Sequence, residues 1–180
     1  MLKIAIVGNI ASGKSTVEKI IASKGYKVYD TDKIAHEILA LNNDVIKEFG
    51  TNNRNELAKI VFSNKEKLDR LEKIIHPLVK EEIFKIFSKV KDSVFISVPQ
   101  LFEAGFDKFF DKIIYITADE SIRLKRLMLR NNLTLEEAQI RINSQKEDEK
   151  RNFSDFVIEN NGDLESLKKS VENVIFLIHK

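Results

Sequence analysis

The sequence predicts an α/β fold in which a mostly parallel sheet is flanked by helices. Short apolar runs alternate with longer segments whose apolar residues keep helical spacing, as in strands joined by helical crossovers. A loop with two glycines follows the first apolar run and opens the first helical segment. The chain has 180 residues, 43% of them hydrophobic, which is enough for one domain with one core.

Five apolar runs are the expected strands: residues 2–7, 27–30, 94–98, 112–117 and 156–158. The first expected helix follows the glycine loop and has its apolar face at Val17, Ile20 and Ile21. Gly25 stands where a helix C-terminus favours a left-handed residue, so this helix should end there. The alternation of strands and helices predicts ligand-binding groups at the carboxyl ends of the strands.

Residues 33–91 are almost wholly helical in pattern. Leu68, Leu71, Ile75 and Leu78 keep the spacing of one helix face, and Pro77 predicts a kink or a break near His76. A helical insertion of this length is too long for a simple crossover. It is expected to form a lobe in which a substrate is held.

Three helix starts fit the capping box, in which a hydroxyl and a carboxylate satisfy backbone amides. They begin at Ser63, Thr117 and Thr134. The last two open a second helical excursion, residues 119–151, which is rich in arginine and lysine.

The loop itself reads Gly8-x-x-x-x-Gly13-Lys14-Ser15, the signature of a phosphate-binding loop. Its inward backbone amides and the following helix N-terminus favour anionic oxygens. Lys14 is expected on the β- and γ-phosphates and Ser15 on Mg²⁺. A dinucleotide-binding loop would need glycine where Ile10 stands. The expected ATP-binding residues in this stretch are Gly8, Ala11, Ser12, Gly13, Lys14, Ser15 and Thr16.

Composition excludes several classes of protein. The chain has no cysteine, so disulfides, thiolate metal sites and cysteine nucleophiles are excluded. A net charge of +2 is too small to indicate a nucleic-acid-binding protein. No apolar run is long enough to span a bilayer, and no signal peptide is recognisable, so we expect a cytoplasmic protein without membrane or nucleic-acid partners.

Other motifs in the chain distinguish between the possible reactions at the γ-phosphate. A GTPase would need Asn-Lys-x-Asp to read guanine, and the nearest match ends at Lys67. A small-molecule kinase needs an acceptor-side carboxylate and cations for the migrating charge. Asp30 and Asp32 close the second expected strand, where strand alternation would place both carboxylates on one side. One would deprotonate an acceptor hydroxyl; the alternative is that Asp32 only caps the next helix.

Basic residues in the second helical excursion form the candidate cation cluster. Arg123, Arg126 and Arg130 recur at helical spacing, and Arg141 follows on the next helix. Guanidinium groups match phosphate oxygens bidentately, so this row can clamp ATP; the alternative is a solvated basic face. Of the three histidines, only His76, before Pro77, is a candidate for facing a ligand.

The chain resembles the dephospho-coenzyme A kinase family, whose members are P-loop kinases similar to nucleoside monophosphate kinases. The segments that carry the resemblance run nearly end to end: GNIASGKST (8–16), YDTDKIAHEI (29–38), FG (49–50), RNELAKIVF (54–62), KIIHPLVKEEI (73–83), VPQLFEAG (98–105), RLMLRNNLTLEEAQIRINSQ (126–145) and VIENNGDLESL (158–167). The HPLV and PxLFE motifs and the 126–145 segment are together far more specific than the phosphate loop.

This resemblance implies one P-loop NTPase domain with a five-stranded parallel sheet, a helical substrate lobe and a lid. The core would comprise about residues 1–32, 92–118 and 152–180, with the acceptor lobe at 33–91 and the lid at 119–151. The implied reaction is ATP-dependent phosphorylation of the 3′-hydroxyl of dephospho-coenzyme A. The implied catalytic residues are Asp32, Lys14, Arg126 and Arg130, with Arg141 on ATP and Asp30, His76 and Glu103 near the acceptor.

The chain departs from the family pattern at several places. Ala11 replaces a frequent glycine, which is tolerable if this position needs no positive φ. His36 replaces an arginine, and Gln100 a leucine. Asn131 and Asn132 stand where Asp-Gly is frequent, and residues 49–54 form a shorter segment than expected.

Two alternative functions stay open. The nearer is a nucleoside monophosphate kinase or another small-molecule kinase with the same donor half. The farther is a non-enzymatic nucleotide-dependent switch, which would phosphorylate no acceptor.

Overall fold

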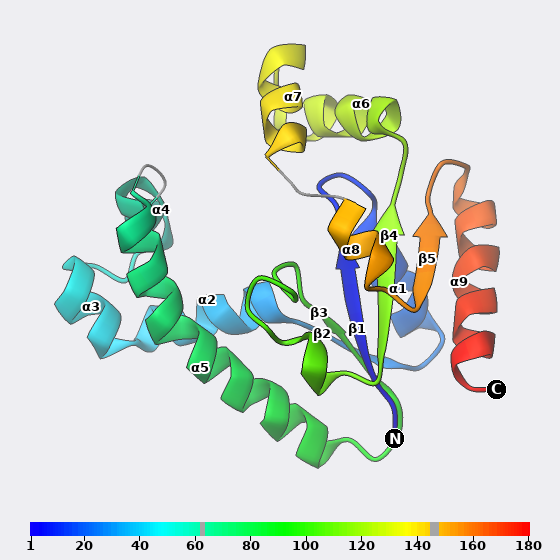
Figure 1. Cartoon of the computed structure of the whole chain (residues 1–180), viewed down its shortest axis with the longest axis horizontal. Coiled ribbons are helices and arrows are strands. Elements are labelled where there is room, and N and C mark those ends of the chain that lie inside the picture. The colour runs from blue at the N-terminus through cyan, green and yellow to red at the C-terminus, as the bar shows by residue number, and fades with distance from the viewer. Residues whose placement is uncertain (62–63, 145–147) are drawn as a thin grey trace. The chain divides into compact units, whose positions relative to one another are not determined.

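The structure, a computed structural model, describes residues 1–61, 64–144 and 148–180 (Figure 1). The chain separates into two compact units. The first comprises Met1–Tyr29 with Asp92–Lys180, and the second comprises Asp30–Lys91. Among the described helices, none is long and apolar enough to cross a membrane.

The first unit contains the sheet. Its five strands are β1 (Lys3–Gly8), β2 (Lys27–Asp30), β3 (Val94–Ser97), β4 (Lys112–Thr117) and β5 (Phe156–Glu159), in the order β2-β3-β1-β4-β5. The described pairings of β1 with β3, β1 with β4 and β4 with β5 are parallel. Because all these strands run the same way, their carboxyl ends meet at one edge. The predicted α/β class and all five strands are confirmed.

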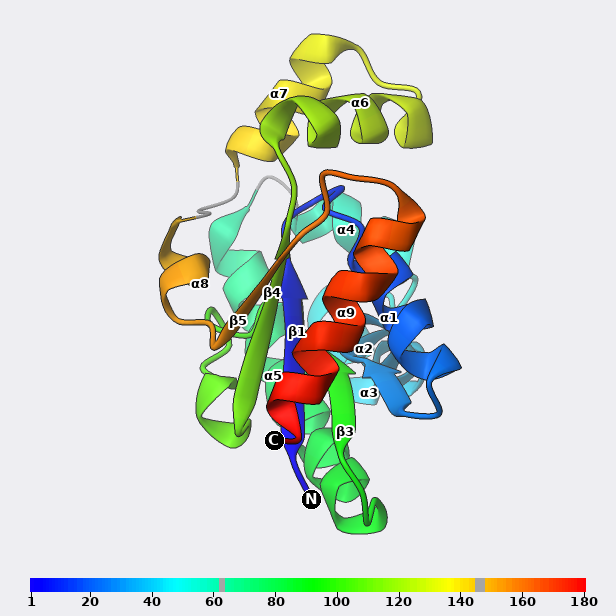
Figure 2. The same ribbon diagram turned by 90° about the vertical axis from the view of Figure 1, so that its right-hand side faces the viewer.

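Two helices pack together over one face of this sheet, α1 (Lys14–Ser23) and α9 (Leu164–Ile178) (Figure 2). Val17, Ile20 and Ile21 are buried as predicted, in one cluster with Ile4 and Ile6 of β1. Gly25 follows the C-cap residue of α1 with φ +89°, which confirms the predicted helix end. The remaining helical elements of this unit are η1 (Asp107–Phe109), α6 (Glu120–Asn131), α7 (Leu135–Asn143) and α8 (Asp148–Asn152).

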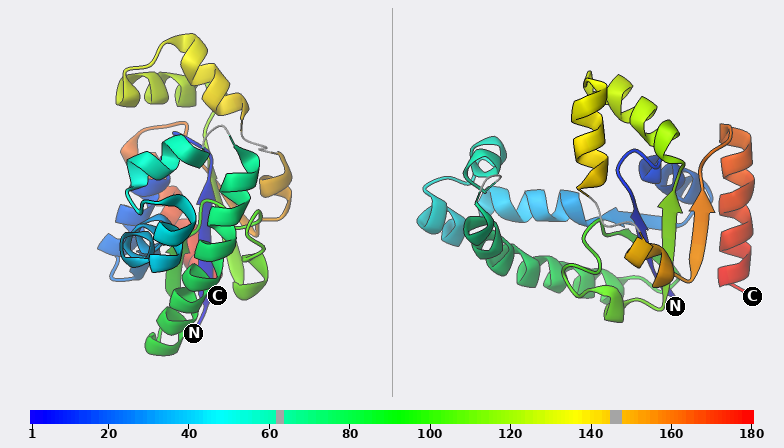
Figure 3. Two further views of the ribbon diagram at one scale, coloured as in Figure 1. Left: turned by 90° about the vertical axis from the view of Figure 1, so that its left-hand side faces the viewer. Right: turned by 45° about the horizontal axis from the view of Figure 1, so that its top comes forward.

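The second unit is wholly helical, as predicted. It comprises α2 (Thr31–Leu41), α3 (Asn43–Phe49), α4 (Arg54–Val61) and α5 (Lys65–Lys89). Helices α2 and α5 lie side by side, and α3 and α4 also contact α5 (Figure 3). The unit therefore consists of short helices gathered on one long one.

A kink or a break was expected near His76; the break is wrong, because α5 runs through Pro77, and the kink stays a prediction. A helix-interior proline removes one backbone hydrogen bond. The buried positions Ile75, Val79, Ile83 and Phe87 nevertheless continue at four-residue spacing on both sides of it. Burial of these four side chains offsets the lost hydrogen bond. The prediction from proline alone did not include this burial.

The three predicted capping boxes have different outcomes. At Thr134 both reciprocal bonds form, so that prediction is confirmed. At Thr117 it is wrong: this residue ends β4, and α6 begins three residues later with Asp119 as N-cap. Ser63 lies outside the described residues, and the N-cap of α5 is Asn64.

Candidate active site

The loop between β1 and α1 has the backbone shape of an anion cradle. Gly13, the N-cap of α1, has φ +93°, a conformation that favours glycine. Its carbonyl accepts from the N–H groups of Thr16 and Val17, which starts the helix. The described structure assigns no partner to the N–H groups of Gly13, Lys14 and Ser15. First-turn amides of this kind, with the positive end of the helix dipole, favour phosphate oxygens.

Gly8 is required for a different reason, the close approach of β4. A Cβ at Gly8 would lie 2.8 Å from the carbonyl oxygen of Ile116 and 3.0 Å from Oγ of Ser12. Ser12 is fully buried, so its hydroxyl lies beneath the loop and not on its open side. The backbone N–H of Ser12 donates to the carbonyl of Asn9 at 3.1 Å, and the expected contact of Ser12 with ATP stays a prediction.

Ala11 occupies a left-handed conformation, with φ +60°. Alanine was expected to be tolerable at this position only if no positive φ was needed, and a positive φ is present. An L-residue other than glycine is destabilised there by about 1–2 kcal/mol. Ile10 and Ala11 also pack against a cluster of α6 and α7 around Leu127, Ala138 and Ile142. This packing helps to hold the strained turn in place.

Lys14 is already paired inside the protein. Its ammonium lies 2.8 Å from Oε1 of Glu18, one helical turn later, and also donates to Oγ of Ser97. Ser97 is fully buried at the end of β3. Ser15 is exposed and Thr16 half-buried on the first turn of α1. The Lys14 ammonium therefore has an anionic partner within its own helix.

Two asparagines support the loop and were missed by the sequence analysis. Asn9 accepts a 2.6 Å hydrogen bond from the hydroxyl of Tyr115. Asn160, directly after β5, donates from its side-chain amide to the carbonyl of Ser12 at 2.8 Å. Both are buried. The available signal was their position, since each follows or ends a strand at the ligand-binding edge.

The predicted arginine row falls into three environments. Arg126 is half-buried and donates to the carbonyls of Asn160 (3.1 Å) and Ser12 (3.5 Å), so it reaches the loop. Arg123 is buried, with 1% of its surface exposed. Arg130 is exposed, and its Nε donates to Asn131 at 2.9 Å.

Arg141 is exposed in the last turn of α7. The backbone N–H of Thr134 and its hydroxyl donate to Glu137 at the other end of this helix, and they hold the pKa of that carboxylate below its usual value. The start of α7 is thereby secured at the turn that precedes Arg141.

Asp30 and Asp32 are placed by a helix start and not by strand alternation. Asp30 ends β2 and is the N-cap of α2; its Oδ1 accepts from the N–H of Asp32 at 2.9 Å. Asp32 lies in the first turn of α2 and is exposed. The expectation that a strand aligns the two carboxylates is therefore wrong. Asp30 takes the capping role considered for Asp32.

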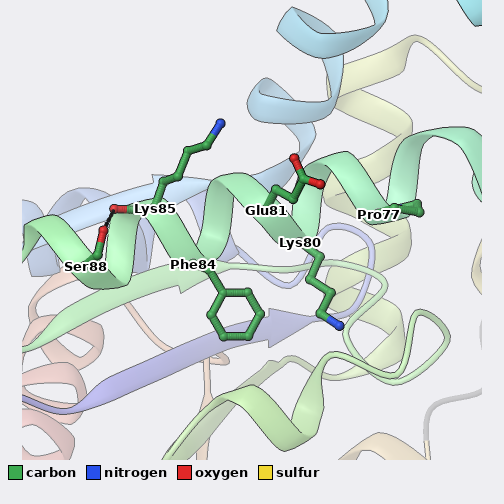
Figure 4. A pocket seen from close by; sticks show the side chains of 6 residues that line it. All are labelled: Pro77, Lys80, Glu81, Phe84, Lys85 and Ser88. Carbon is green, nitrogen blue, oxygen red and sulfur yellow. Dashed lines mark hydrogen bonds between the residues drawn. The ribbon is translucent and has the colours of Figure 1, made fainter.

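His76 is half-buried in α5, beside Pro77. Pro77 lines a depression of about 650 Å³ together with residues one to three turns later: Lys80, Glu81, Phe84, Lys85 and Ser88. Figure 4 shows that Lys80 and Phe84 extend on one side of the helix and Glu81 and Lys85 on the other. A mixed apolar and cationic surface therefore follows His76 along α5.

Glu103 lies in the first unit, in the segment between β3 and η1. It pairs with Lys150 of α8 at 2.7 Å. Both line a cavity of about 890 Å³ that also includes Phe102, Phe153 and Lys108. A ligand in this cavity would meet two aromatic rings and two ammonium groups.

The structure thus gathers Lys14, Ser15 and Arg126 at one loop of the first unit. It places Asp30, Asp32 and His76 in the second unit. The arrangement in the first unit can receive a polyphosphate, with backbone amides, one lysine and one arginine as donors.

The family model described as dephospho-CoA kinase matches residues 2–166. The dephospho-CoA kinase of Fusobacterium nucleatum is 44% identical, with 94% of each chain covered. That of Listeria monocytogenes is 40% identical and covers 96% of this chain and 94% of its own.

Solved structures agree. A Thermus thermophilus protein, TT1252, superposes with a TM-score of 0.86 at 33% identity, covering 98% of this chain and 97% of its own. The dephospho-CoA kinase of Campylobacter jejuni superposes with a TM-score of 0.73 at 32% identity, covering 98% of this chain and 96% of its own. The shikimate kinase of Acinetobacter baumannii, at 16% identity and 0.62, shares the fold alone. The chain belongs to the dephospho-CoA kinase family.

Proposed function

We propose that this protein transfers the γ-phosphoryl group of ATP to the ribose 3′-hydroxyl of dephospho-coenzyme A, giving coenzyme A and ADP. The observation that carries the proposal is the family match over residues 2–166, which spans the phosphate loop, the helical unit and helices α6 and α7. This reaction is the last step of coenzyme A synthesis.

The phosphate loop holds the donor. The N–H groups of Gly13, Lys14 and Ser15 receive phosphate oxygens, and the backbone of Gly8, Ala11, Ser12 and Thr16 shapes the cradle. Lys14 moves from Glu18 to the β- and γ-phosphates. Phosphoryl transfer has a loose transition state with charge on the equatorial oxygens, so these donors act mainly by electrostatic stabilisation.

A divalent metal is expected with ATP, and we propose Mg²⁺. The exposed Ser15 hydroxyl fits this ion, because Mg²⁺ prefers oxygen ligands and keeps several waters. Mg²⁺ bound there would neutralise charge on the β- and γ-phosphates. The protein's own part is to present that hydroxyl one residue after Lys14.

Asp32 is the proposed general base. It takes the proton of the 3′-hydroxyl while the oxygen attacks the γ-phosphorus and ADP leaves. The bond from the Asp32 N–H to Asp30 holds the turn that carries it. Asp30 and His76 of the helical unit and Glu103 of the sheet-containing unit are proposed to contact the acceptor, with about residues 33–91 as the acceptor lobe.

Helices α6 and α7, within residues 119–151, are the proposed lid. Arg126 and Arg130 would stabilise the charge of the migrating phosphoryl group, and Arg141 would bind ATP. Arg126 supports this role best, because it already contacts two carbonyls at the loop. Closure over the loop would exclude water and limit wasteful hydrolysis.

The test is a phosphorylation assay with purified protein, magnesium, ATP and a panel of hydroxyl acceptors, including dephospho-coenzyme A, AMP, CMP and shikimate. Phosphorus NMR locates the new phosphate. We expect a 3′-phosphomonoester on dephospho-coenzyme A. A new phosphoanhydride on AMP or CMP would instead establish a nucleoside monophosphate kinase, and no phosphorylated acceptor would contradict the kinase proposal.

A further inference from the structure

Asn160 connects three segments that are far apart in the sequence. Its backbone N–H donates to the carbonyl of Thr117 at the end of β4, at 2.8 Å. Its side-chain amide donates to the carbonyl of Ser12, also at 2.8 Å, and its own carbonyl accepts from Arg126 at 3.1 Å. Only 7% of its surface is exposed. The residue is therefore held between the sheet, the phosphate loop and α6.

The bond to Ser12 sets the direction of a whole peptide unit. The carbonyl of Ser12 and the N–H of Gly13 belong to the same peptide group, and no cis peptide occurs in the described chain. In a trans peptide these two groups point in opposite directions. Because Asn160 holds the Ser12 carbonyl on its own side, the Gly13 N–H is turned the other way, away from Asn160.

The same contact accounts for the need for glycine at position 13. A Cβ there would lie 2.2 Å from Nδ2 of Asn160, far inside any allowed contact. Gly13 also has φ +93°, which side chains disfavour. The Asn160 amide thus occupies the space that a side chain at position 13 would need.

Arg126 completes the arrangement. It donates to both carbonyls, Asn160 at 3.1 Å and Ser12 at 3.5 Å, the second near the limit of a hydrogen bond. The short bond from the Asn160 amide is therefore the principal restraint on Ser12. The loop between β5 and α9, which begins with Asn160, lies beside the loop between β1 and α1 (Figure 2).

We propose that Asn160 is a positioning residue that preorganises the phosphate loop by holding the Ser12–Gly13 peptide with its N–H toward the polyphosphate. Without this amide the Ser12 carbonyl would lose its principal partner, and the peptide could rotate and present oxygen to the phosphates. Asn160 acts through the loop and touches no reacting atom. The inference deepens the proposed function, but its test needs no acceptor.

The experiment measures binding of ATP and of inorganic tripolyphosphate, each with magnesium, by isothermal titration calorimetry. Asn160→Ala is compared with Asn161→Ala, because Asn161 is the neighbouring asparagine, is exposed, and bonds to Asp119 instead of the loop. We expect Asn160→Ala to weaken both ligands by roughly tenfold or more, as for loss of a partner to a buried carbonyl. Asn161→Ala should leave both within about twofold.

Tripolyphosphate distinguishes the proposed role from direct contact with the nucleoside. If Asn160→Ala weakened ATP but left tripolyphosphate unchanged, Asn160 would act on the base or ribose, and the proposal would be wrong. It would also be wrong if neither ligand changed, or if Asn161→Ala weakened both equally. Because the loop N–H groups are also proposed to stabilise the migrating phosphoryl group, the turnover number of Asn160→Ala at saturating ATP should fall as well, and that of Asn161→Ala should not.

The unfolding midpoint of each variant is measured first. If Asn160→Ala does not fold, Asn160→Ser replaces it, because serine is polar but too short to reach the Ser12 carbonyl. The same loss of both ligands is expected. Parent-like tripolyphosphate binding by a folded Asn160→Ser would overturn the proposal.

Discussion

The ammonium group of Lys14 lies 2.8 Å from the carboxylate of Glu18, one turn along the same helix. Both side chains are mostly buried, with 20% and 16% of their surface exposed. The lysine expected on ATP is therefore neutralised by an acid of its own helix, and we expect phosphate to compete with that acid for the lysine.

Glu18→Gln removes this competition. We expect ATP to bind roughly two- to fivefold more tightly, which matches the modest strength of a partly exposed ion pair. Isothermal titration calorimetry with ATP and magnesium measures it. Glu172→Gln is the matched control, because it breaks another lysine–glutamate pair, Lys24–Glu172, with the same change of net charge. Weaker binding by Glu18→Gln would show that Glu18 positions Lys14 instead of restraining it.

Asp32→Asn tests the proposed general base. We expect turnover to fall by roughly two orders of magnitude or more with little change in the KM for ATP, because the base acts only on the acceptor proton. Steady-state kinetics with dephospho-coenzyme A measures both. Asp44→Asn is closely matched: each aspartate follows an N-cap side chain that accepts from its N–H at 2.9 Å. Turnover of Asp32→Asn within a few-fold of the parent would remove Asp32 from that role.

Ala11→Gly should stabilise the protein. The left-handed backbone costs alanine about 1–2 kcal/mol, and the extra chain entropy of glycine offsets part of the gain. We expect the free energy of unfolding to rise by about 0.5–1 kcal/mol. Asn132→Gly, at the other non-glycine position of positive φ among the described residues, is the control. Asparagine tolerates this conformation, so little change is expected there.

Gly13→Ala and Gly25→Ala separate steric contact from backbone strain. Their φ values are nearly equal, +93° and +89°, but a Cβ at Gly25 meets nothing within 4 Å, whereas one at Gly13 would overlap Asn160. Gly25→Ala should cost only the backbone term, about 1–2 kcal/mol, and leave ATP binding intact. Gly13→Ala should destabilise more and weaken ATP by at least about tenfold. Chemical denaturation and calorimetry measure the two effects; equal outcomes would argue against the contact with Asn160.

Asp163→Asn tests a pH-dependent helix cap. Asp163 caps α9, and the backbone N–H of Ser166 holds the pKa of this carboxylate below its usual value. A pKa that is lower in the folded state gives stability above the carboxylate's ordinary pKa, and this stability is lost as the pH falls through the folded-state pKa. Asparagine also caps helices but does not titrate. The parent's unfolding midpoint should therefore fall more steeply on acidification than that of Asp163→Asn.

The control for this prediction is Glu165→Gln, which removes a carboxylate from the same first turn without touching the cap bond. Calorimetry between about pH 3 and 7 gives the midpoints. Parallel pH profiles for the parent and Asp163→Asn would mean that the cap bond does not couple to protonation.

Local pattern was sufficient for much of the fold. The apolar runs before Gly8 and at residues 112–117 are strands, the Thr134 box caps α7, and residues 33–91 are largely helical. It failed for the break near Pro77, where burial of one face of α5 outweighed a local preference. It also failed at Asp32, because a β-strand pattern was extended one turn into a helix that starts at Thr31.

The sequence by itself predicted a phosphate cradle, since Gly8, Gly13, Lys14 and Ser15 lie within eight consecutive residues in the spacing of that motif. Only the tertiary structure decided what holds that cradle: Asn160 against Ser12, Tyr115 against Asn9, and Ser97 on Lys14. The reason is geometric. A parallel sheet in the order β2-β3-β1-β4-β5 brings strand ends from distant parts of the chain to one edge, and no short-range pattern records which polar side chains meet there.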